Sequence, residues 1–312
     1  MKKTTDKLPT SLIEAIRYFA DADRCFDFMM AIRWEDGVPV CPRCGVDETS
    51  FISTRKIWKC KGCKRQFSLK VGTIFEDSGL GFDKWLPAMW LIANSKNGIS
   101  SCELGRSLGI TQKSAWFMNH RIRLAMASGT FQKLSGTVET DETYIGGLAK
   151  NMHNSSKSRR VHGTGGTDKV AIHGAVERGG SLVASVLPRV TAAELQASIR
   201  GWVASGSTVY TDQHKGYRGL DVDYDHRSVN HGMGEYVRGD IHTNSIENFW
   251  NLYKRAWKGT YTHNLPEHTD RYIAERTFSY NHRDLTDIQR MIAVTSTVAG
   301  KRITYTDLKV RR

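Results

Sequence analysis

The sequence has no long apolar run. Its longest run lies at about Ala88–Ala93, far short of the roughly 18 apolar residues that a membrane-spanning helix needs. The chain begins Met-Lys-Lys, but Asp6 and Glu14 interrupt the apolar region that a signal peptide requires. Six cysteines among 312 residues are too few for a secreted disulfide scaffold. We therefore expect a soluble cytoplasmic protein with no membrane partner.

Acidic residues are fewer than basic residues. The chain has 32 Asp and Glu against 45 Lys and Arg, which gives a formal net charge of +13. Such a surface attracts polyanions, so nucleic acid is the favoured partner, although the same charge could serve solubility alone. Hydrophobic residues make up 39% and Trp occurs 8 times, which excludes a disordered chain. At about 150 residues per domain, the length predicts about two domains.

Four of the cysteines form two pairs with the spacing of a metal site. The pairs are Cys41-Pro42-Arg43-Cys44 and Cys60-Lys61-Gly62-Cys63, with fifteen residues between them. Two such turns let four thiolates converge on one tetrahedral ion, which closes the coordination shell and leaves no position for catalysis. The spacing therefore predicts a structural Zn²⁺; four free thiols or two disulfides are the alternatives.

Two short strands are expected between the cysteine pairs, at Thr49–Thr54 and Lys56–Lys59, so that the unit is a zinc ribbon. Basic side chains crowd around it and suit a phosphate-contacting surface, although a solvated face would look the same. Cys25 and Cys102 have no partner at metal spacing, and we expect both to be small core residues.

A pair of helices follows the ribbon. Ser100-x-x-Glu103 predicts a helix start, Gly109 a turn, and Thr111 the cap of a second helix that reaches about Ala127. Two helices joined by a glycine-containing turn resemble a helix-turn-helix, whose second helix enters the major groove, although helix pairs are common in any α-rich domain. Donors able to reach bases or phosphates on that helix are Gln112, Lys113, Asn119, Arg121 and Arg123.

Beyond about Gly129 the pattern changes from helical to alternating. A strand at Thr137–Ile145 places Glu139, Asp141 and Thr143 on one face. A hairpin and a helix follow, then a strand at Thr208–Thr211 that ends at Asp212, and finally an amphipathic helix at Asn244–Lys258 that contains Glu247. This order of elements predicts a ribonuclease-H-like α/β domain.

Asp141, Asp212 and Glu247 could converge on one site. Phosphoryl transfer on DNA needs carboxylates that hold two divalent ions, and hard oxygen ligands select Mg²⁺ or Mn²⁺. Each residue also has a structural explanation. Asp141 could be one charge beside Glu139 and Glu142, Asp212 could form a turn, and Glu247 could complete a capping box with Asn244. The ordered set of three favours the catalytic interpretation.

Several longer blocks of the sequence are similar to those of a known protein family. The chain resembles bacterial insertion-sequence DDE transposases of the zinc-ribbon, ISXO-like type along nearly its whole length. The blocks that carry the resemblance are Cys41-Pro42-Arg43-Cys44, Gly72-Thr73-Ile74-Phe75, Val138-Glu139-Thr140-Asp141-Glu142-Thr143-Tyr144-Ile145-Gly146-Gly147, Thr211-Asp212-Gln213-His214-Lys215-Gly216-Tyr217 and His242-Thr243-Asn244-Ser245-Ile246-Glu247-Asn248-Phe249-Trp250. The 34 residues between Asp212 and Glu247 match the short final spacing of DDE enzymes. Gln213 departs from the family pattern, in which an acidic residue is expected at this position.

The resemblance implies a catalytic triad of Asp141, Asp212 and Glu247 that binds Mg²⁺ or Mn²⁺. It implies an enzyme that binds the terminal inverted repeats of an element as double-stranded DNA. The enzyme would cleave the DNA at these ends and join the freed 3′-hydroxyl to target DNA. It would act at the nucleoid as a homodimer or higher assembly. It divides the chain into an N-terminal helical segment (1–36), the zinc ribbon (37–75), a helix-turn-helix-like domain (76–130), the ribonuclease-H-like catalytic domain (131–290) and a basic C-terminal tail (291–312).

Several other residues have more than one possible role. Lys150, Lys157, Arg159 and Arg160 lie in a loop that could contact DNA or be plainly disordered. His242 and Asn244 are candidates to orient a carboxylate or contact DNA, and turn formation explains them equally well. Two rival functions are a DNA-binding regulator derived from a transposase, and a nuclease or junction resolvase that hydrolyses DNA without joining strands.

Overall fold

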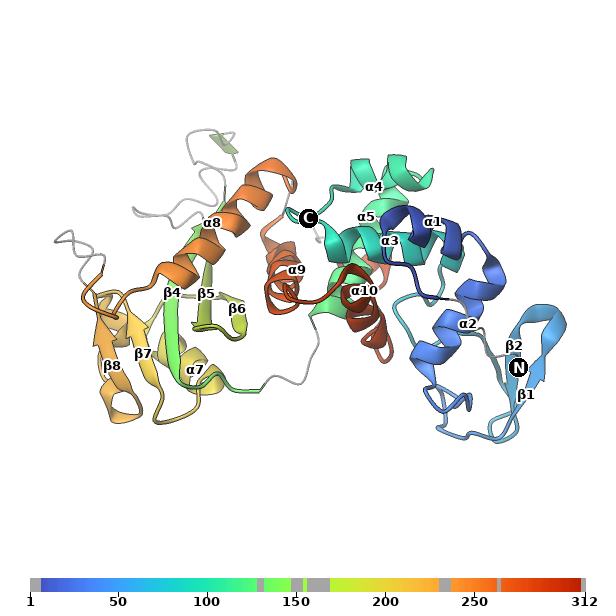
Figure 1. Cartoon of the computed structure of the whole chain (residues 1–312), viewed down its shortest axis with the longest axis horizontal. Coiled ribbons are helices and arrows are strands. Elements are labelled where there is room, and N and C mark those ends of the chain that lie inside the picture. Colours follow the sequence, from blue (N-terminus) through green and yellow to red (C-terminus); the bar gives the residue numbers. More distant parts are fainter. Residues whose placement is uncertain are drawn as a thin grey trace. The chain divides into compact units, whose positions relative to one another are not determined.

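The computed structural model describes residues 7–127, 132–146, 154–155, 169–229, 237–262 and 265–309. The chain divides into two compact units (Figure 1). The first unit contains Met1–Gly129 together with His282–Arg312, and the second unit contains Thr130–Asn281. No helix in the described part of the chain is long and apolar enough to cross a membrane.

The first unit combines the zinc ribbon with a set of helices. A three-stranded antiparallel sheet in the order β1-β2-β3 forms the ribbon. Its strands are β1 (Thr49–Ile52), β2 (Ile57–Cys60) and β3 (Gln66–Phe67), with the 3₁₀ helix η1 (Ser53–Arg55) between the first two. The helices are α1 (Leu12–Phe19), α2 (Ala22–Arg33), α3 (Phe82–Asn94), α4 (Ser101–Leu108), α5 (Gln112–Met126), α10 (Asp287–Ser296) and α11 (Tyr305–Leu308).

The C-terminal segment belongs to the first unit. A basic tail from residue 291 was expected after a catalytic domain ending at residue 290, but α10 packs against α3 and buries Met291 and Val294 completely. Ile303 and Leu308 are also buried. This stretch is therefore part of a folded core, because its apolar residues at helical spacing need a partner surface.

The helix pair α4 and α5 forms where the sequence predicts it. Ser100 and Thr111 cap the two helices, and Gly109 takes the left-handed conformation at the turn with φ of 64°. The prediction of DNA-contacting donors on α5 is wrong for three residues, because Asn119, Arg121 and Arg123 are 1%, 3% and 2% exposed.

Arg121 shows why these polar side chains are inside. Its guanidinium donates to the carbonyl oxygens of Ile74, Glu76 and Ile303, at 2.8, 2.7 and 3.3 Å. Buried carbonyl groups need hydrogen-bond donors, and Arg121 supplies them from the inner face of α5. Gln112 and Lys113, at the start of the helix, are exposed.

The second unit is built on a mixed five-stranded sheet in the order β6-β5-β4-β7-β8. β4 (Thr137–Ile145), β5 (Val170–Glu177) and β6 (Leu182–Leu187) are antiparallel, whereas β7 (Thr208–Thr211) and β8 (Asp225–Ser228) continue the sheet in parallel. This order is consistent with a ribonuclease-H-like fold. The remaining elements are α7 (Ala192–Trp202), η3 (Lys215–Tyr217), η4 (Leu220–Val222), α8 (Asn244–Gly259), η6 (Pro266–His268) and α9 (Thr269–Asn281).

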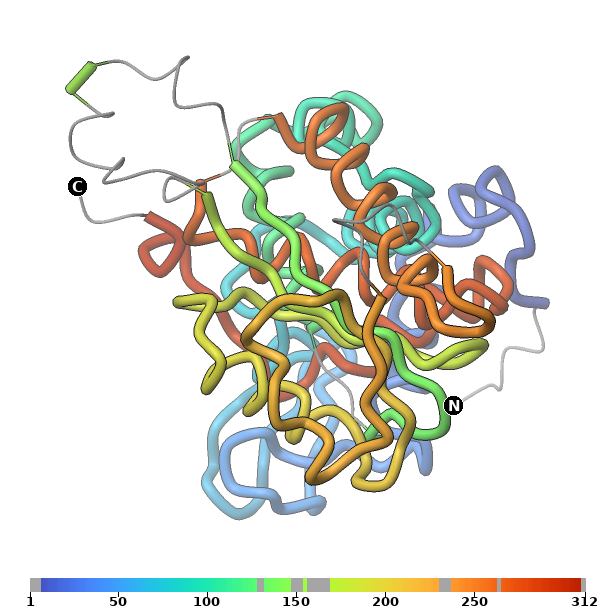
Figure 2. The backbone as a smooth tube through the Cα atoms, turned by 90° about the vertical axis from the view of Figure 1, so that its left-hand side faces the viewer, coloured from blue at the N-terminus to red at the C-terminus, as the bar shows by residue number. Residues whose placement is uncertain are grey.

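Each face of this sheet has its own apolar core. Leu195 and Ile199 of α7 pack against Val138 and Val209 on one face. On the other face, α8 lies across β4 and β5 and α9 lies against β6 (Figures 1 and 2). The alternation along β4 sends Val138 to the α7 face and Asp141 to the α8 face, as the period of two predicts. The register places Asp141 opposite Gly174.

Candidate active site and zinc site

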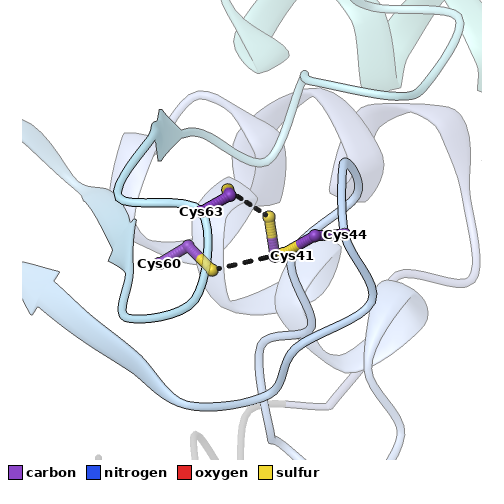
Figure 3. Close-up of side chains that lie close together, drawn as sticks. All are labelled: Cys41, Cys44, Cys60 and Cys63. Atoms are coloured by element: carbon purple, nitrogen blue, oxygen red, sulfur yellow. Dashed lines mark hydrogen bonds between the residues drawn. The ribbon is translucent and has the colours of Figure 1, made fainter.

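The four paired cysteines converge at one point of the ribbon (Figure 3). Their sulfur atoms all lie within 4.8 Å of one another, with Cys41 Sγ 3.8 Å from Cys63 Sγ and Cys44 Sγ 3.5 Å from Cys60 Sγ. A tetrahedral zinc ion with Zn–S bonds of about 2.3 Å requires sulfur separations of about 3.8 Å, whereas a disulfide requires about 2.05 Å. The set of donors therefore fits Zn²⁺ and not disulfides.

The environment of Cys44 also favours metal binding. The backbone N–H of Val46 and the neighbouring Cys60 lower the pKa of the Cys44 thiol to about 7. A thiolate is the form that ligates a metal, and these contacts favour it at Cys44, whereas burial raises the pKa of the Cys60 thiol to about 11.

The two other cysteines differ from each other. Cys25 is buried as expected, and burial raises the pKa of its thiol to about 12. The expectation for Cys102 is wrong, since it lies exposed on α4. It faces outward because the apolar stripe of that short helix is formed by Leu104 and Leu108.

The three predicted carboxylates lie on neighbouring elements of the second unit. Asp141 is in the middle of β4, Asp212 directly follows β7, and Glu247 is in the first turn of α8. β7 pairs with β4, and α8 packs over β4. All three side chains are partly buried.

Burial and three neighbouring negative charges act on Asp141. The pKa of Asp141 is raised to about 8, first by burial and then by the negative charges of Glu142, Asp212 and Glu247. Among the ion pairs of the described residues, none includes Asp141 or Asp212. A cation stabilises a partly buried group of like charges, and carboxylate oxygens are the donor type that Mg²⁺ or Mn²⁺ prefers. Among the described residues, however, the four cysteines are the one group whose ligand atoms lie close enough together to hold a metal ion, so the three carboxylates share neighbouring elements without forming a closed metal cluster.

Two hydrogen bonds orient these carboxylates. The backbone N–H of His214 donates to Asp212 Oδ1 at 2.9 Å. The hydroxyl of Thr243 donates to Glu247 Oε1 at 2.8 Å. Each of these two acidic side chains is therefore tied to its own chain segment.

The N-terminus of α8 is capped differently from the expectation. The sequence pattern allows Asn244 and Glu247 to form a capping box, but the helix already includes Asn244 and its N-cap is Thr243. The N–H groups of Ser245 and Ile246 donate to Glu139 Oε2 on β4, at 2.7 and 3.3 Å. A carboxylate from the sheet thus meets the first turn of the helix that carries Glu247.

Sequence reasoning missed the importance of Glu139 and Arg178. Glu139 is 0% exposed and pairs with Arg178, whose Nε lies 2.7 Å from Glu139 Oε1. A charged residue on a strand face that is otherwise buried was the available signal. Of the open candidates, His242 contacts this pair, with Nδ1 2.9 Å from Arg178 Nη2 and 3.3 Å from Glu139 Oε1. Asn244 is exposed.

Glu142 points to the opposite face of the sheet from Asp141. The hydroxyl of Tyr217 donates to it, and His214 Nδ1 lies 3.8 Å from its Oε1. Burial is the main reason that the pKa of Glu142 is raised. The basic residues Lys150, Lys157, Arg159 and Arg160 lie outside the described residues.

Comparison with known proteins identifies two matching families. Residues 133–281 match a family described as the ISXO2-like transposase domain, and residues 20–66 match the transposase zinc-ribbon domain.

Two relatives extend this similarity. A Halobacterium salinarum protein described as an uncharacterized protein in transposable element ISH50 is 29% identical over 253 residues, which cover 77% of this chain and 84% of the relative. An uncharacterized transposase-like protein of Haemophilus influenzae is 33% identical over 102 residues, which cover 32% of this chain and 80% of the relative.

Proposed function

The chain belongs to the family of ISXO2-like transposases with a zinc ribbon, and from that premise we propose that it cleaves the ends of an insertion sequence and joins them to target DNA. Asp141, Asp212 and Glu247 are the proposed catalytic triad. The observation that carries this proposal is the placement of the three carboxylates on two paired strands and on the helix packed over them, near enough that Asp212 and Glu247 contribute to raising the pKa of Asp141.

The roles of the residues follow from their chemistry. The three carboxylates would hold divalent ions through hard oxygen atoms, and such ions activate an attacking oxygen and stabilise a leaving oxygen at a phosphodiester. Thr243 and the backbone of His214 would keep Glu247 and Asp212 oriented for that purpose. After cleavage has freed the 3′-hydroxyl of the element, this hydroxyl attacks a phosphodiester of the target DNA. One phosphodiester replaces another, so the reaction needs no nucleotide cofactor.

DNA binding is assigned to the first unit. We propose that the zinc ribbon and the α4–α5 pair recognise the terminal inverted repeats, with Gln112 and Lys113 as exposed donors at the start of α5. The net charge of +13 supports a polyanionic partner. Two ends have to be brought together for joining, so the DNA complex is proposed to contain at least two copies of the chain, at the nucleoid.

The test is a joining assay on DNA that carries the gene with its own flanking sequence. Purified protein is incubated with this fragment, a target plasmid and Mg²⁺ or Mn²⁺, and both end cleavage and strand joining are scored. Wild type is expected to cleave and join. Asp141→Asn, Asp212→Asn and Glu247→Gln are each expected to lower cleavage by at least about 1,000-fold, because each removes a charged oxygen ligand.

DNA binding separates the possible outcomes. The three variants should bind the ends about as well as wild type in gel-shift titrations. Cleavage without joining by wild type would instead support a nuclease. End binding without cleavage by wild type would support a regulator, and a variant that nicks at the normal rate would remove its residue from the triad.

A further inference from the structure

Three residues near the proposed triad come from the same three elements. Glu139 precedes Asp141 by two positions on β4, Tyr210 precedes Asp212 by two positions, and Ser245 precedes Glu247 by two positions. Residues two apart on a strand share a face, and Glu139 and Tyr210 are register partners in the sheet. Glu139 therefore lies beside Tyr210 on the face of the sheet that carries Asp141, and Ser245 belongs to the first turn of α8.

Glu139 joins β4 to the start of α8. Its Oε2 accepts hydrogen bonds from the N–H groups of Ser245 and Ile246, and its Oε1 accepts one from the Ser245 hydroxyl at 3.0 Å. A fully buried carboxylate is tolerated only where its oxygens are hydrogen-bonded and its charge is balanced. The helix N-terminus and Arg178 supply both conditions.

Arg178 extends the connection to β7 and to the segment that enters α8. Its guanidinium carbon lies 4.9 Å from the centre of the Tyr210 ring. Its Nη2 donates to the carbonyl oxygen of His242 at 3.2 Å and lies 2.9 Å from His242 Nδ1. One ion pair thereby contacts all three elements that hold the proposed triad.

We propose that Glu139 and Arg178 are positioning residues for the metal-binding carboxylates. This inference rests on the proposed function, since it assigns a role relative to Asp141, Asp212 and Glu247. The pair sets where the first turn of α8 lies against β4, and so sets the distance of Glu247 from Asp141. Metal binding depends on that distance more steeply than folding does, because a divalent ion needs its ligands placed within a few tenths of an ångström.

The alternative is that the pair only stabilises the fold. In that case its loss lowers the melting temperature but leaves the folded fraction with normal metal affinity. A direct measurement of Mn²⁺ binding separates the two, because it does not depend on DNA or on turnover.

The experiment measures Mn²⁺ affinity by the electron paramagnetic resonance signal of free Mn²⁺, on zinc-loaded full-length protein. Glu139→Gln keeps the size of the side chain and removes its charge. It is expected to weaken Mn²⁺ binding by about 10- to 100-fold, the range typical of residues that orient metal ligands. Zinc content and end binding in gel-shift assays are expected to match wild type, since both are assigned to the first unit.

Two further variants test the pair if Glu139→Gln folds poorly. Arg178→Lys keeps the charge but loses the forked donor, and Ser245→Ala removes one hydroxyl and leaves both backbone donors. Both should weaken Mn²⁺ binding by a smaller factor than Glu139→Gln. The matched control is Arg200→Gln, which breaks the Arg200–Asp223 ion pair at 2.8 Å in the same unit and should leave Mn²⁺ affinity unchanged.

Failure of this inference and failure of the proposed function give different results. If Asp141→Asn abolishes the Mn²⁺ site but folded Arg178→Lys and Ser245→Ala bind Mn²⁺ like wild type, the positioning role is overturned and the triad stands. If Asp141→Asn itself leaves Mn²⁺ affinity unchanged, the proposed function is contradicted and the positioning role falls with it.

Discussion

His173 is buried directly behind the acidic face of the sheet. It lies on β5 with no exposed surface, and its Nε2 is 2.8 Å from the hydroxyl of Thr140. Burial lowers the pKa of His173 to about 3. The imidazole is therefore neutral in the folded protein under ordinary conditions, and charging it has to disrupt the packing.

This burial predicts how stability depends on pH. An unfolded His173 titrates near pH 6.5 and the folded one near 3, so the unfolded chain binds the extra proton between these values. The stability that neutral His173 contributes is complete above about pH 6.5 and is lost as the pH falls toward 3, by at most about 1.4 kcal/mol per pH unit. The free energy of unfolding, measured with urea at pH 7, 6, 5 and 4, should fall less steeply toward low pH in His173→Gln than in wild type. Equal slopes for the two proteins would contradict the expectation.

Gly174 is the residue that lets α8 approach the sheet. It lies opposite Asp141, and a Cβ atom at this position would come within 2.8 Å of the Trp250 ring and 3.2 Å of Ile246. Trp250 is 2% exposed, so it has little room to move.

Gly174→Ala should therefore push α8, and with it Glu247, away from Asp141. We expect a loss of about 1–3 kcal/mol of stability from overpacking, together with weaker Mn²⁺ binding. The matched control is Gly201→Ala in α7, where a Cβ atom meets nothing within 4 Å and stability should stay the same or rise by up to about 1 kcal/mol. Thermal unfolding of the two variants measures the difference. Equal stability of the two variants would show that the Trp250 ring moves aside without cost, and would contradict the prediction.

At the scale of single elements, the zinc ribbon makes a separate prediction. Cys41→Ser should lower zinc from one ion per chain toward zero, because three thiolates hold zinc far less tightly than four and the ribbon's fold depends on the ion. End binding should weaken in parallel. Zinc measured by mass spectrometry is the readout, and Cys102→Ser, which alters an exposed cysteine outside the cluster, should retain full zinc. Unchanged zinc in Cys41→Ser would contradict the ribbon assignment.

Most elements could be predicted from their periodicity. The strands at Thr137–Ile145 and Thr208–Thr211 match the expectation to the residue, and the capped helices α4 and α5 begin where Ser100 and Thr111 place them. Local pattern decides these elements, because a strand face or a helix cap depends on residues that are close in sequence.

Contacts between distant segments could not be predicted in the same way. Arg121 has the composition of a DNA contact, yet its partners are carbonyl groups 47, 45 and 182 positions away. Glu139 has the composition of a surface charge, yet it caps a helix more than 100 residues later. A single sequence gives the type of each side chain but not which buried backbone groups need it, so the three carboxylates could be proposed as a triad from the sequence while the contacts of Glu139 and Arg178 could not be predicted.

At the scale of the whole molecule, the proposed catalytic residues and the proposed DNA-recognition elements lie in different units. The second unit contains all three proposed catalytic carboxylates, and the first contains the ribbon and the α4–α5 pair. The chain leaves the first unit before β4 and returns to it after α9, so that α10 completes the core begun by α3 and α5. The sequence did not reveal this return, because α10 has the same apolar pattern whichever unit it packs against.

The central claim is that one set of carboxylates in the second unit performs metal-dependent cleavage, and a change of ligand chemistry tests it most directly. Asp212→Cys replaces a hard oxygen ligand with a sulfur ligand, which Mn²⁺ accepts more readily than Mg²⁺. End cleavage by this variant should be lost in Mg²⁺ and partly restored in Mn²⁺, whereas wild type cleaves in both and Asp212→Asn in neither. Equal cleavage by Asp212→Cys in the two metals, at the wild-type rate, would contradict the account.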